Sequence, residues 1–284
     1  MSDRPEEQLR ALAGAYRPSV NVAQAPHPLL VLPFLAAGWV SLVLAGLLSV
    51  RFAPLLAQRS FSALPVLGLV HLMTLGFLTT TILGTLQQWI PVVFDVPALD
   101  PKVSSRQALI WGGGLVIFLL GWFVKDVGMV AAGGGIAALG LLLFTILASA
   151  RMAKSARPRD TIFWTVSGAL FALNLVWALG LGMALSWNGA AIGLLPPEVL
   201  ALHLATALVA WMGLLVMGVE LKLVPMFAMA SLQNLRVGGP PTLALAGYLS
   251  FWFIPWSKDF STLAAAFWLA AALWALAQVG WSLR

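Results

Sequence analysis

The sequence predicts an all-α integral membrane protein with about eight transmembrane helices, arranged as two repeats of four helices. Of the 284 residues, 61% are hydrophobic and only 9% are charged, and the mean hydropathy is +0.94. Charged residues make up roughly a quarter of a soluble globular protein, so this chain has too few polar side chains to cover a water-facing surface. Long apolar stretches also recur between short polar breaks, and a helix needs about 20 such residues to cross a bilayer.

The predicted organisation is a tail, residues 1–27, followed by two four-helix repeats, residues 28–150 and 151–284. The tail is interpreted as cytoplasmic rather than as a secretory signal, because Asp3 and Glu6 come early and a polar stretch precedes the first apolar run. The predicted spans are Leu29–Val50, Ala63–Ile90, Ala108–Phe123, Val127–Ala150, Ile162–Trp187, Val199–Gly218, Leu243–Trp256 and Leu263–Leu283.

Lysine and arginine are distributed unequally between the two sides of the predicted membrane. The tail, the loops after the second, fourth and sixth helices, and Arg284 carry twelve of the 16 cations, and the opposite side carries four. Because cytoplasmic loops are enriched in cations, both termini are predicted to be cytoplasmic, in the inner (cytoplasmic) membrane of a prokaryote. The same distribution accounts for the net charge of +6 without a nucleic-acid partner.

Two features of the composition limit the chemistry and the packing. Cysteine is absent, which excludes disulfides, Cys-ligated iron–sulfur clusters, thiolate nucleophiles and covalent haem attachment through Cys. Small residues are frequent inside the spans, where they are predicted to let helix backbones approach closely. They are Gly112–Gly114, Gly133–Gly135, Gly180 and Gly182.

Two segments resemble each other and predict an internal duplication. One begins His71-Leu-Met-Thr and the other begins His203-Leu-Ala-Thr, and in each a glycine is followed seven residues later by a proline, Pro91 or Pro225. The spacing from histidine to glycine differs by two residues. These segments belong to the second and sixth spans, and an offset of four helices keeps their direction across the membrane, as in parallel repeats.

The histidines are the candidate metal ligands. His27 lies between two prolines and is interpreted as a surface residue, whereas His71 and His203 lie inside the second and sixth spans at similar depths. An ionisable residue inside a span is costly and indicates function. Two imidazoles at equivalent places in a duplicated unit could face one axis and bind a metal or a haem iron.

Haem suits this predicted pair better than a bare metal ion does. A bare copper or zinc ion takes three or four ligands, whereas haem supplies four nitrogens, so that His71 and His203 complete the coordination of its iron. The flat macrocycle also needs small neighbours, which are predicted one or two turns beyond each histidine. These neighbours are Thr74, Gly76, Thr206, Ala207 and Ala210.

The segments around His71 and His203 resemble the even-numbered helices of the haem–copper oxidase catalytic subunit superfamily, and look closest to its small relatives. The shared pattern is His-Leu-x-Thr, then Gly, then a Pro that closes the helix, with Phe just after it. The resemblance covers residues 71–94 and 203–227. In the large oxidases such helices carry the histidine ligands of a low-spin haem, so the resemblance implies that His71 and His203 hold a b-type haem.

The sequence departs from the oxidases at the residues that reduce oxygen. It has no adjacent His pair, no His-Pro-Glu-Val-Tyr motif, and only two tyrosines, Tyr16 and Tyr248. The expected function is therefore a membrane-embedded bis-histidine haem b protein, for electron transfer or for handling haem or a diatomic gas in a respiratory context. A complete oxygen-reducing oxidase is not expected.

A haem held in this way would lie in the outer half of the membrane. Its two propionates need water or cations, because burying an unpaired carboxylate is costly. Arg51 and Arg59 lie in the outer loop that leads into the second helix, and the guanidinium fork suits a carboxylate. At least one of them is predicted to contact a propionate, with Lys258 as the reserve candidate.

Two other classes of function stay open at this point. Parallel repeats and polar residues inside the membrane are also normal in transporters and channels, and Gln87 and Gln88 could line a proton path or a quinone pocket. The chain could also be a non-catalytic subunit or an assembly factor of a respiratory complex. The expected partners are the lipid bilayer, a redox partner or respiratory-complex subunits, and a second copy of the chain in a homodimer.

Overall fold

The computed structural model is helical, without strands, over the residues that it describes, which are 24–157, 159–189, 197–227, 246–249, 266, 269–271, 273, 274 and 277. In this part of the chain, six helices are long and apolar enough to cross a membrane. They are α2 (Leu32–Arg51), the continuous α4–η3–α5 (Leu64–His71, Leu72–Thr79, Thr80–Phe94), α6 (Pro101–Val124), α7 (Val127–Ala153), α8 (Thr161–Trp187) and the continuous α9–η4–α10 (Pro197–Ala205, Thr206–Gly213, Leu214–Phe227). Two short helices, η2 (Pro28–Leu30) and α3 (Ala53–Ala57), flank α2. The chain is thus a multi-pass membrane protein.

The first six predicted spans each correspond to one of these helices. The sixth span continues nine residues past its predicted end at Gly218, to Phe227. The largest difference at a helix start is at α6, which begins at Pro101 rather than at Ala108, because the side chain of Asp100 accepts hydrogen bonds from the backbone N–H groups of Lys102 and Val103 and Pro suits the first helical position. The predicted spans Leu243–Trp256 and Leu263–Leu283 lie largely outside the described residues.

Acidic residues also cap the next two helices. The side chain of Asp126 accepts from the N–H of Met129 at 3.0 Å, at the start of α7. The side chain of Asp160 accepts from the N–H of Phe163 at 3.0 Å, at the start of α8. A carboxylate at this position satisfies free backbone donors and opposes the positive end of the helix dipole.

Glycines bring α6 and α7 into close contact. A Cβ at Gly114 would collide with the backbone of Ala137, and a Cβ at Gly133 would collide with the backbone of Phe118. The predicted packing role is confirmed for these two glycines. By contrast, no atom lies within 4 Å of a Cβ built at Gly112, Gly113 or Gly135.

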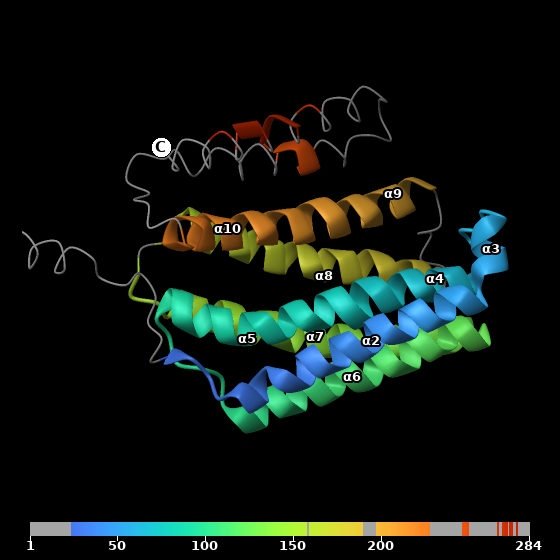
Figure 1. The fold of residues 1–284 in the computed structure, drawn as a ribbon, viewed down its shortest axis with the longest axis horizontal. Helices are drawn as coiled ribbons and strands as arrows, with labels where there is room; N and C mark the ends of the chain where they lie inside the picture. Colours follow the sequence, from blue (N-terminus) through green and yellow to red (C-terminus); the bar gives the residue numbers. More distant parts are fainter. Residues whose placement is uncertain are drawn as a thin grey trace, which may run out of the picture.

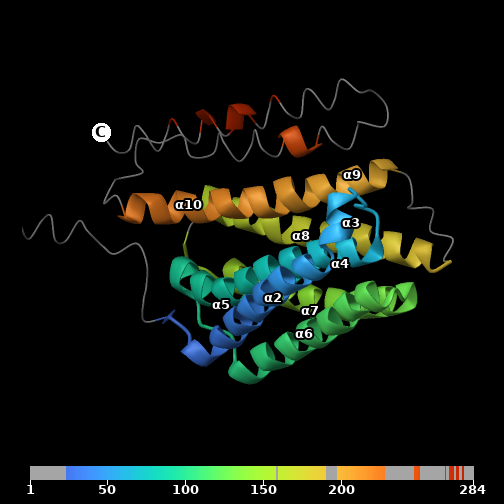
Figure 2. The same cartoon turned by 45° about the vertical axis from the view of Figure 1, so that its right-hand side comes forward.

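The two histidine-bearing helices pack on different neighbours, and α7 packs on both α6 and α8. On one side, α2 packs on η3 and α5, and α4 packs on α6. On the other side, α8 packs on α9, η4 and α10. Figures 1 and 2 show α9–η4–α10 and α4–η3–α5 running roughly parallel along the bundle, with α3 and the starts of α4 and α9 at the same end. We refer to this end of the bundle as the α3 end.

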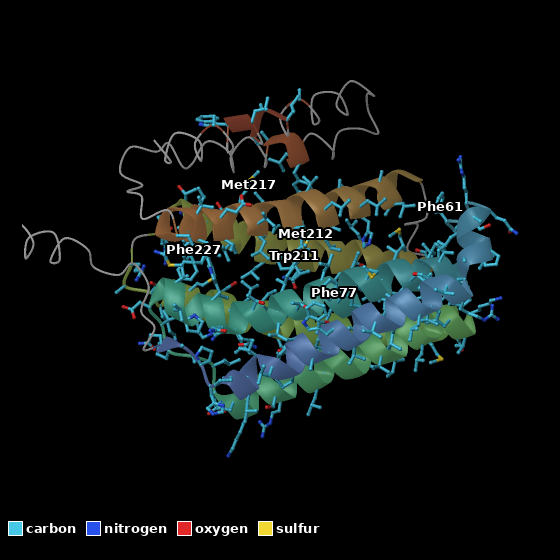
Figure 3. The ribbon with its side chains drawn as sticks, viewed as in Figure 1. Phe61, Phe77, Trp211, Met212, Met217 and Phe227 are labelled. Carbon is cyan, nitrogen blue, oxygen red and sulfur yellow. The ribbon has the colours of Figure 1, made fainter. Side chains whose placement is uncertain are left out.

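Both histidine-bearing helices contain a π-helical stretch of eight residues. η3 begins one residue after His71, and η4 begins three residues after His203. Within the first helix, the hydroxyls of Thr79 and Thr80 donate to carbonyls five residues earlier, both at 2.8 Å. Such stretches are rare and occur frequently at functional sites. Figure 3 places Phe77 of η3 and Trp211 and Met212 of η4 near the middle of the bundle's long axis.

Candidate functional site

His71 and His203 line the same cavity, which has a volume of about 520 Å³. The cavity lies between α4–η3 and α9, and α6, α7 and α8 complete its walls. Phe61 and Ser62, just before α4, and Leu200 of α9 also line it, towards the α3 end, where Figure 3 shows Phe61. Two segments that are 132 residues apart in the sequence therefore present their imidazoles to one space.

The two imidazoles also lie at similar depths. His71 is seven residues after the start of α4 at Leu64, and His203 is six residues after the start of α9 at Pro197. At a rise of ~1.5 Å per residue, both lie about 10 Å along their helices from the α3 end. The two depths can be compared here because the structure gives the starts of both helices, which the sequence predicted only approximately.

Backbone and aromatic contacts fix the ring of His71. Its Nδ1 is 2.7 Å from the carbonyl oxygen of Leu67, one turn earlier in the same helix. The indole of Trp122 stacks on it with a centroid distance of 5.3 Å and an interplanar angle of 9°, and the ring of Phe118 meets it edge-on at 5.2 Å. Both aromatic residues come from α6, so α6 holds this imidazole in place.

The ring of His203 is fixed by a different helix. Its Nδ1 is 3.0 Å from the carbonyl oxygen of Val176 on α8. Gly180, one turn further along α8, makes this approach possible, because a Cβ built there would lie 3.0 Å from Cε1 of His203. Any side chain at residue 180 would therefore press on the imidazole.

These hydrogen bonds determine the tautomer of both histidines. A carbonyl oxygen can only accept, so each Nδ1 must carry the hydrogen, and the lone pair of a neutral imidazole then lies on Nε2. Neither Nε2 has a hydrogen-bond partner among the described residues. Metal-ligating histidines show this arrangement, with one nitrogen donating to a backbone carbonyl and the other free for the metal.

The walls of the cavity suit a flat apolar ligand with polar substituents. They are mostly aliphatic and aromatic, with Gly134, Gly180 and Ala184 leaving room between larger side chains. The volume lies within the ~300–1,000 Å³ that is typical of ligand pockets. The indole N–H groups of Trp122 and Trp177 are buried without an acceptor in the described part of the chain. The residues present therefore fit a haem.

The structure places the predicted small neighbours away from this cavity. Gly76 packs against Ser41 of α2, because a Cβ there would lie 2.9 Å from the Ser41 hydroxyl. The hydroxyl of Thr74 donates to Val70 at 2.9 Å within its own helix. Thr206 is fully buried, donates to Leu202 at 2.6 Å and shares a hydrogen bond with the Tyr248 hydroxyl.

The two alanines of that set also do not appear among the residues that line the histidine cavity. Ala210 is buried in the hydrophobic core, and Ala207 packs against it. Of the predicted site residues in the described structure, His71 and His203 are thus the two that share the cavity.

The predicted cations lie in the segment that leads to the cavity. Arg51 is the last residue of α2, with its guanidinium 5.7 Å from the centre of the Phe52 ring. Arg59 has a left-handed backbone conformation, with φ of 55°, two residues before Phe61. Both side chains are exposed. Their contact with a propionate stays a prediction, and Lys258 lies outside the described residues.

Sequence reasoning missed the residues that position the imidazoles. Phe118 and Trp122 come from α6, and Val176 and Gly180 come from α8. An aromatic at every fourth position of a span, as at 118 and 122, was a signal available in the sequence, but nothing in it indicated which helix would face His71. Gly180 was predicted to pack helices, and in the structure it packs against a histidine ring.

Comparison with models of protein families, with curated proteins and with solved structures finds no match to this chain. The fold and the site therefore define the class on their own: a multi-pass α-helical membrane protein with a two-histidine cavity. Within the described residues, no group of three or more His, Cys, Asp or Glu side chains is placed to hold a metal ion.

Proposed function

We propose that this protein is a membrane-embedded haem b protein in which His71 and His203 are the two axial ligands of one iron. One observation carries the proposal: both imidazoles line a single cavity, each with Nδ1 held by a backbone carbonyl and Nε2 without a partner. A haem supplies a one-electron couple when it is bound, so we propose electron transfer in a respiratory context. Ligation by two histidines leaves no position for a substrate on the iron.

The residues around the histidines have separate tasks in this proposal. The carbonyls of Leu67 and Val176 orient the two rings. Trp122 and Phe118 keep water from one face of the His71 ring. Phe61 and Ser62 lie towards the α3 end, where propionates could reach the membrane surface near Arg51 and Arg59.

We also propose that the chain is an internal duplication of a four-helix unit. Three parallels support this: each histidine-bearing helix enters from the α3 end, each has an eight-residue π-helical stretch soon after its histidine, and each packs on the spanning helix that precedes it. Those preceding helices are α2 in the first half and α8 in the second. A pair of related helices gives a natural origin for a pair of similar ligands.

The α3 end is proposed to face away from the cytoplasm in a prokaryotic inner membrane, with both termini in the cytoplasm. The sequence predicts twelve of the 16 Lys and Arg residues on the opposite side, and cations collect on cytoplasmic loops. A reporter fused after Arg284 that works only in the cytoplasm should be active, and one that works only outside should be inactive. The reverse pattern would show that the orientation is inverted.

The test of haem binding is the absorption spectrum of the purified protein, oxidised and then reduced with dithionite. The parent should show the bands of a low-spin b-type haem. His71→Ala and His203→Ala should each lose these bands while the protein still inserts into the membrane. His27→Ala is the matched control, because His27 is exposed and the one side-chain hydrogen bond it makes in the described structure is with the backbone N–H of Leu29.

Two results would overturn the proposal. If His71→Ala and His203→Ala each keep full haem with unchanged bands, the ligands lie elsewhere. If the parent, expressed with sufficient haem, contains none, the cavity serves another purpose. The two other classes, a transporter or channel and a non-catalytic subunit or assembly factor, would then be preferred.

A further inference from the structure

A second cavity, with a volume of about 450 Å³, lies between α2, η3 and α6. Leu29, Leu109 and Val116 are among the residues that line it, and all three are exposed on the outside of the bundle, Leu109 to 75%. In a membrane protein such apolar surface faces lipid. The second cavity therefore opens towards the bilayer, and its ligand would enter from the lipid phase.

Hydroxyl groups line the inner part of this cavity. Ser104 is only 2% exposed, and its oxygen accepts a hydrogen bond from the Gln87 amide at 3.2 Å. The hydroxyl hydrogen of Ser104 has no acceptor among the described residues, so it is available to a ligand oxygen. The amide oxygen of Gln87 is likewise buried without a partner in this part of the structure. A buried polar group without a partner is costly, and Ser104, which lines the cavity, is the member of this pair that a bound group can reach.

Side chains that line the second cavity contact side chains that line the histidine cavity. Trp111 lines the second cavity and Trp177 lines the histidine cavity, and these two indoles meet edge-on with a centroid distance of 5.7 Å. Consecutive residues of η3 divide in the same way, since Leu75 lines the histidine cavity and Gly76 lines the second. Phe118, which touches His71, also contacts Trp177 at 5.9 Å.

We propose that the second cavity binds the ring of a lipid-soluble isoprenoid quinone or quinol, the electron partner of the haem; this rests on the proposed function. The ligand must enter from lipid, hydrogen-bond through a neutral oxygen, and lie beside the histidine cavity. A quinone has a neutral polar ring on an apolar tail. A phospholipid head group carries charge, and no charged side chain of the described residues lines this cavity.

The reaction balances with the groups already named. Oxidation of one quinol to quinone breaks two O–H bonds and releases two electrons and two protons. The electrons reduce two ferric haem equivalents to the ferrous state. The protons leave through the polar end of the cavity, where Ser104 lies one turn after Asp100, the residue that caps α6, and reach water beyond it.

The first experiment uses an azido-quinone analogue as a photolabel on the full chain in liposomes, with the labelled peptides identified by mass spectrometry. The variant is Gly112→Phe: Gly112 lines the second cavity and has no atom within 4 Å of a built Cβ, so a phenyl ring should fill the space without displacing backbone. Gly113→Phe is the matched control, since Gly113 has the same open surroundings but does not line the cavity.

The parent and Gly113→Phe should both be labelled on α2 and α6, and unlabelled quinone should compete. Gly112→Phe should reduce the labelling by at least about tenfold. Equal labelling of Gly112→Phe and the parent would overturn the quinone site. Labelling by an azido-phospholipid at the same residues, without competition by quinone, would show an ordinary lipid site and would also overturn it.

A second measurement separates this proposal from the haem proposal. In haem-loaded protein, a quinol should reduce the haem of the parent and of Gly113→Phe, whereas in Gly112→Phe only dithionite should reduce it. Competed labelling in a protein without haem would keep the quinone site and end the haem proposal. A bis-histidine spectrum in a protein without specific labelling would keep the haem proposal and end the quinone site.

Discussion

The two histidine-bearing helices begin with similar sequences but hold their imidazoles in different ways. In α4–η3–α5, the Nδ1 of His71 bonds to Leu67, in the same helix, and α6 supplies two aromatic rings against the imidazole. In α9–η4–α10, the Nδ1 of His203 bonds to Val176 on α8, and the imidazole lies against Gly180 of the same helix. One ring is anchored locally, and the other is anchored by tertiary structure.

This difference indicates which interactions each ligand depends on. A carbonyl four residues earlier is present in any helix, so His71 keeps its anchor whenever its own helix forms. The anchor of His203 exists only when α9 is docked on α8, and the docking needs a glycine at the point of contact. Substitutions near His203 should therefore act by pushing its imidazole out of place. Substitutions near His71 should act by removing aromatic contacts with its imidazole.

The largest expected effect outside the histidines is that of Gly180→Val. A Cβ at this position would lie 3.0 Å from Cε1 of His203, and the two methyl groups of valine add to the overlap. The imidazole must move and lose its bond to Val176, at a cost of about 1–3 kcal/mol for an overpacked site. The haem content per protein should fall by about tenfold or more at limiting haem.

The control for this substitution is Gly135→Val in α7. It makes the same change within a spanning helix, but no atom lies within 4 Å of the added Cβ. Gly180→Ala should fall between the two, because one methyl group asks the ring to shift by only a few tenths of an ångström. Equal haem content in Gly180→Val and Gly135→Val would show that the Val176 anchor is dispensable.

A smaller effect is expected from Trp122→Leu. This change removes the indole that stacks on His71 at 5.3 Å and leaves the bond from Nδ1 to Leu67 intact. An aromatic pair contributes about 0.5–1.5 kcal/mol beyond its buried area, which corresponds to roughly a twofold to tenfold loss in haem affinity. Equilibrium titration of the haem-free protein with haem would measure this loss in affinity.

Trp164→Leu is the comparison for that titration. Trp164 is exposed on the outside of α8 and does not line the histidine cavity. Both substitutions replace an indole with the same aliphatic side chain, so any common effect on insertion or folding cancels. If the two variants bind haem equally, the stack on His71 contributes nothing to the ligand.

The sequence was sufficient to predict most of the described fold, for a physical reason. Bilayer thickness sets the length of an apolar helix, so six spans could be placed from hydropathy alone. The rule failed at the start of α6, where Lys102 and Arg106 made the first turns look like a loop. The combination of Asp100 and Pro101 was the signal for a helix start there.

The site was predicted only in part, because its walls come from other helices. An ionisable residue inside a span indicates His71 and His203 by itself. Their neighbours were sought one or two turns further along the same helices, but most of the cavity wall comes from other helices. Gly76 faces α2, and the actual neighbours on α6 and α8 depend on packing that the sequence does not display.

The smallest effect is expected from substitutions at the α3 end, away from the two imidazole rings. Arg51 and Arg59 lie in the segment between α2 and α4, close in sequence to Phe61 and Ser62, which line the histidine cavity. If either guanidinium pairs with a propionate, Arg51→Gln or Arg59→Gln removes a nearby positive charge. The reduced haem carries one more electron, so losing that charge should lower its midpoint potential. Because exposed charges are screened, the shift should not exceed about 59 mV, a factor of ten for a one-electron couple. Potentiometric titration measures this shift. Arg106→Gln is the control, since Arg106 is an exposed arginine near the start of α6, at the end of the bundle opposite the α3 end. If both variants titrate like the control and retain haem equally, other groups hold the propionates.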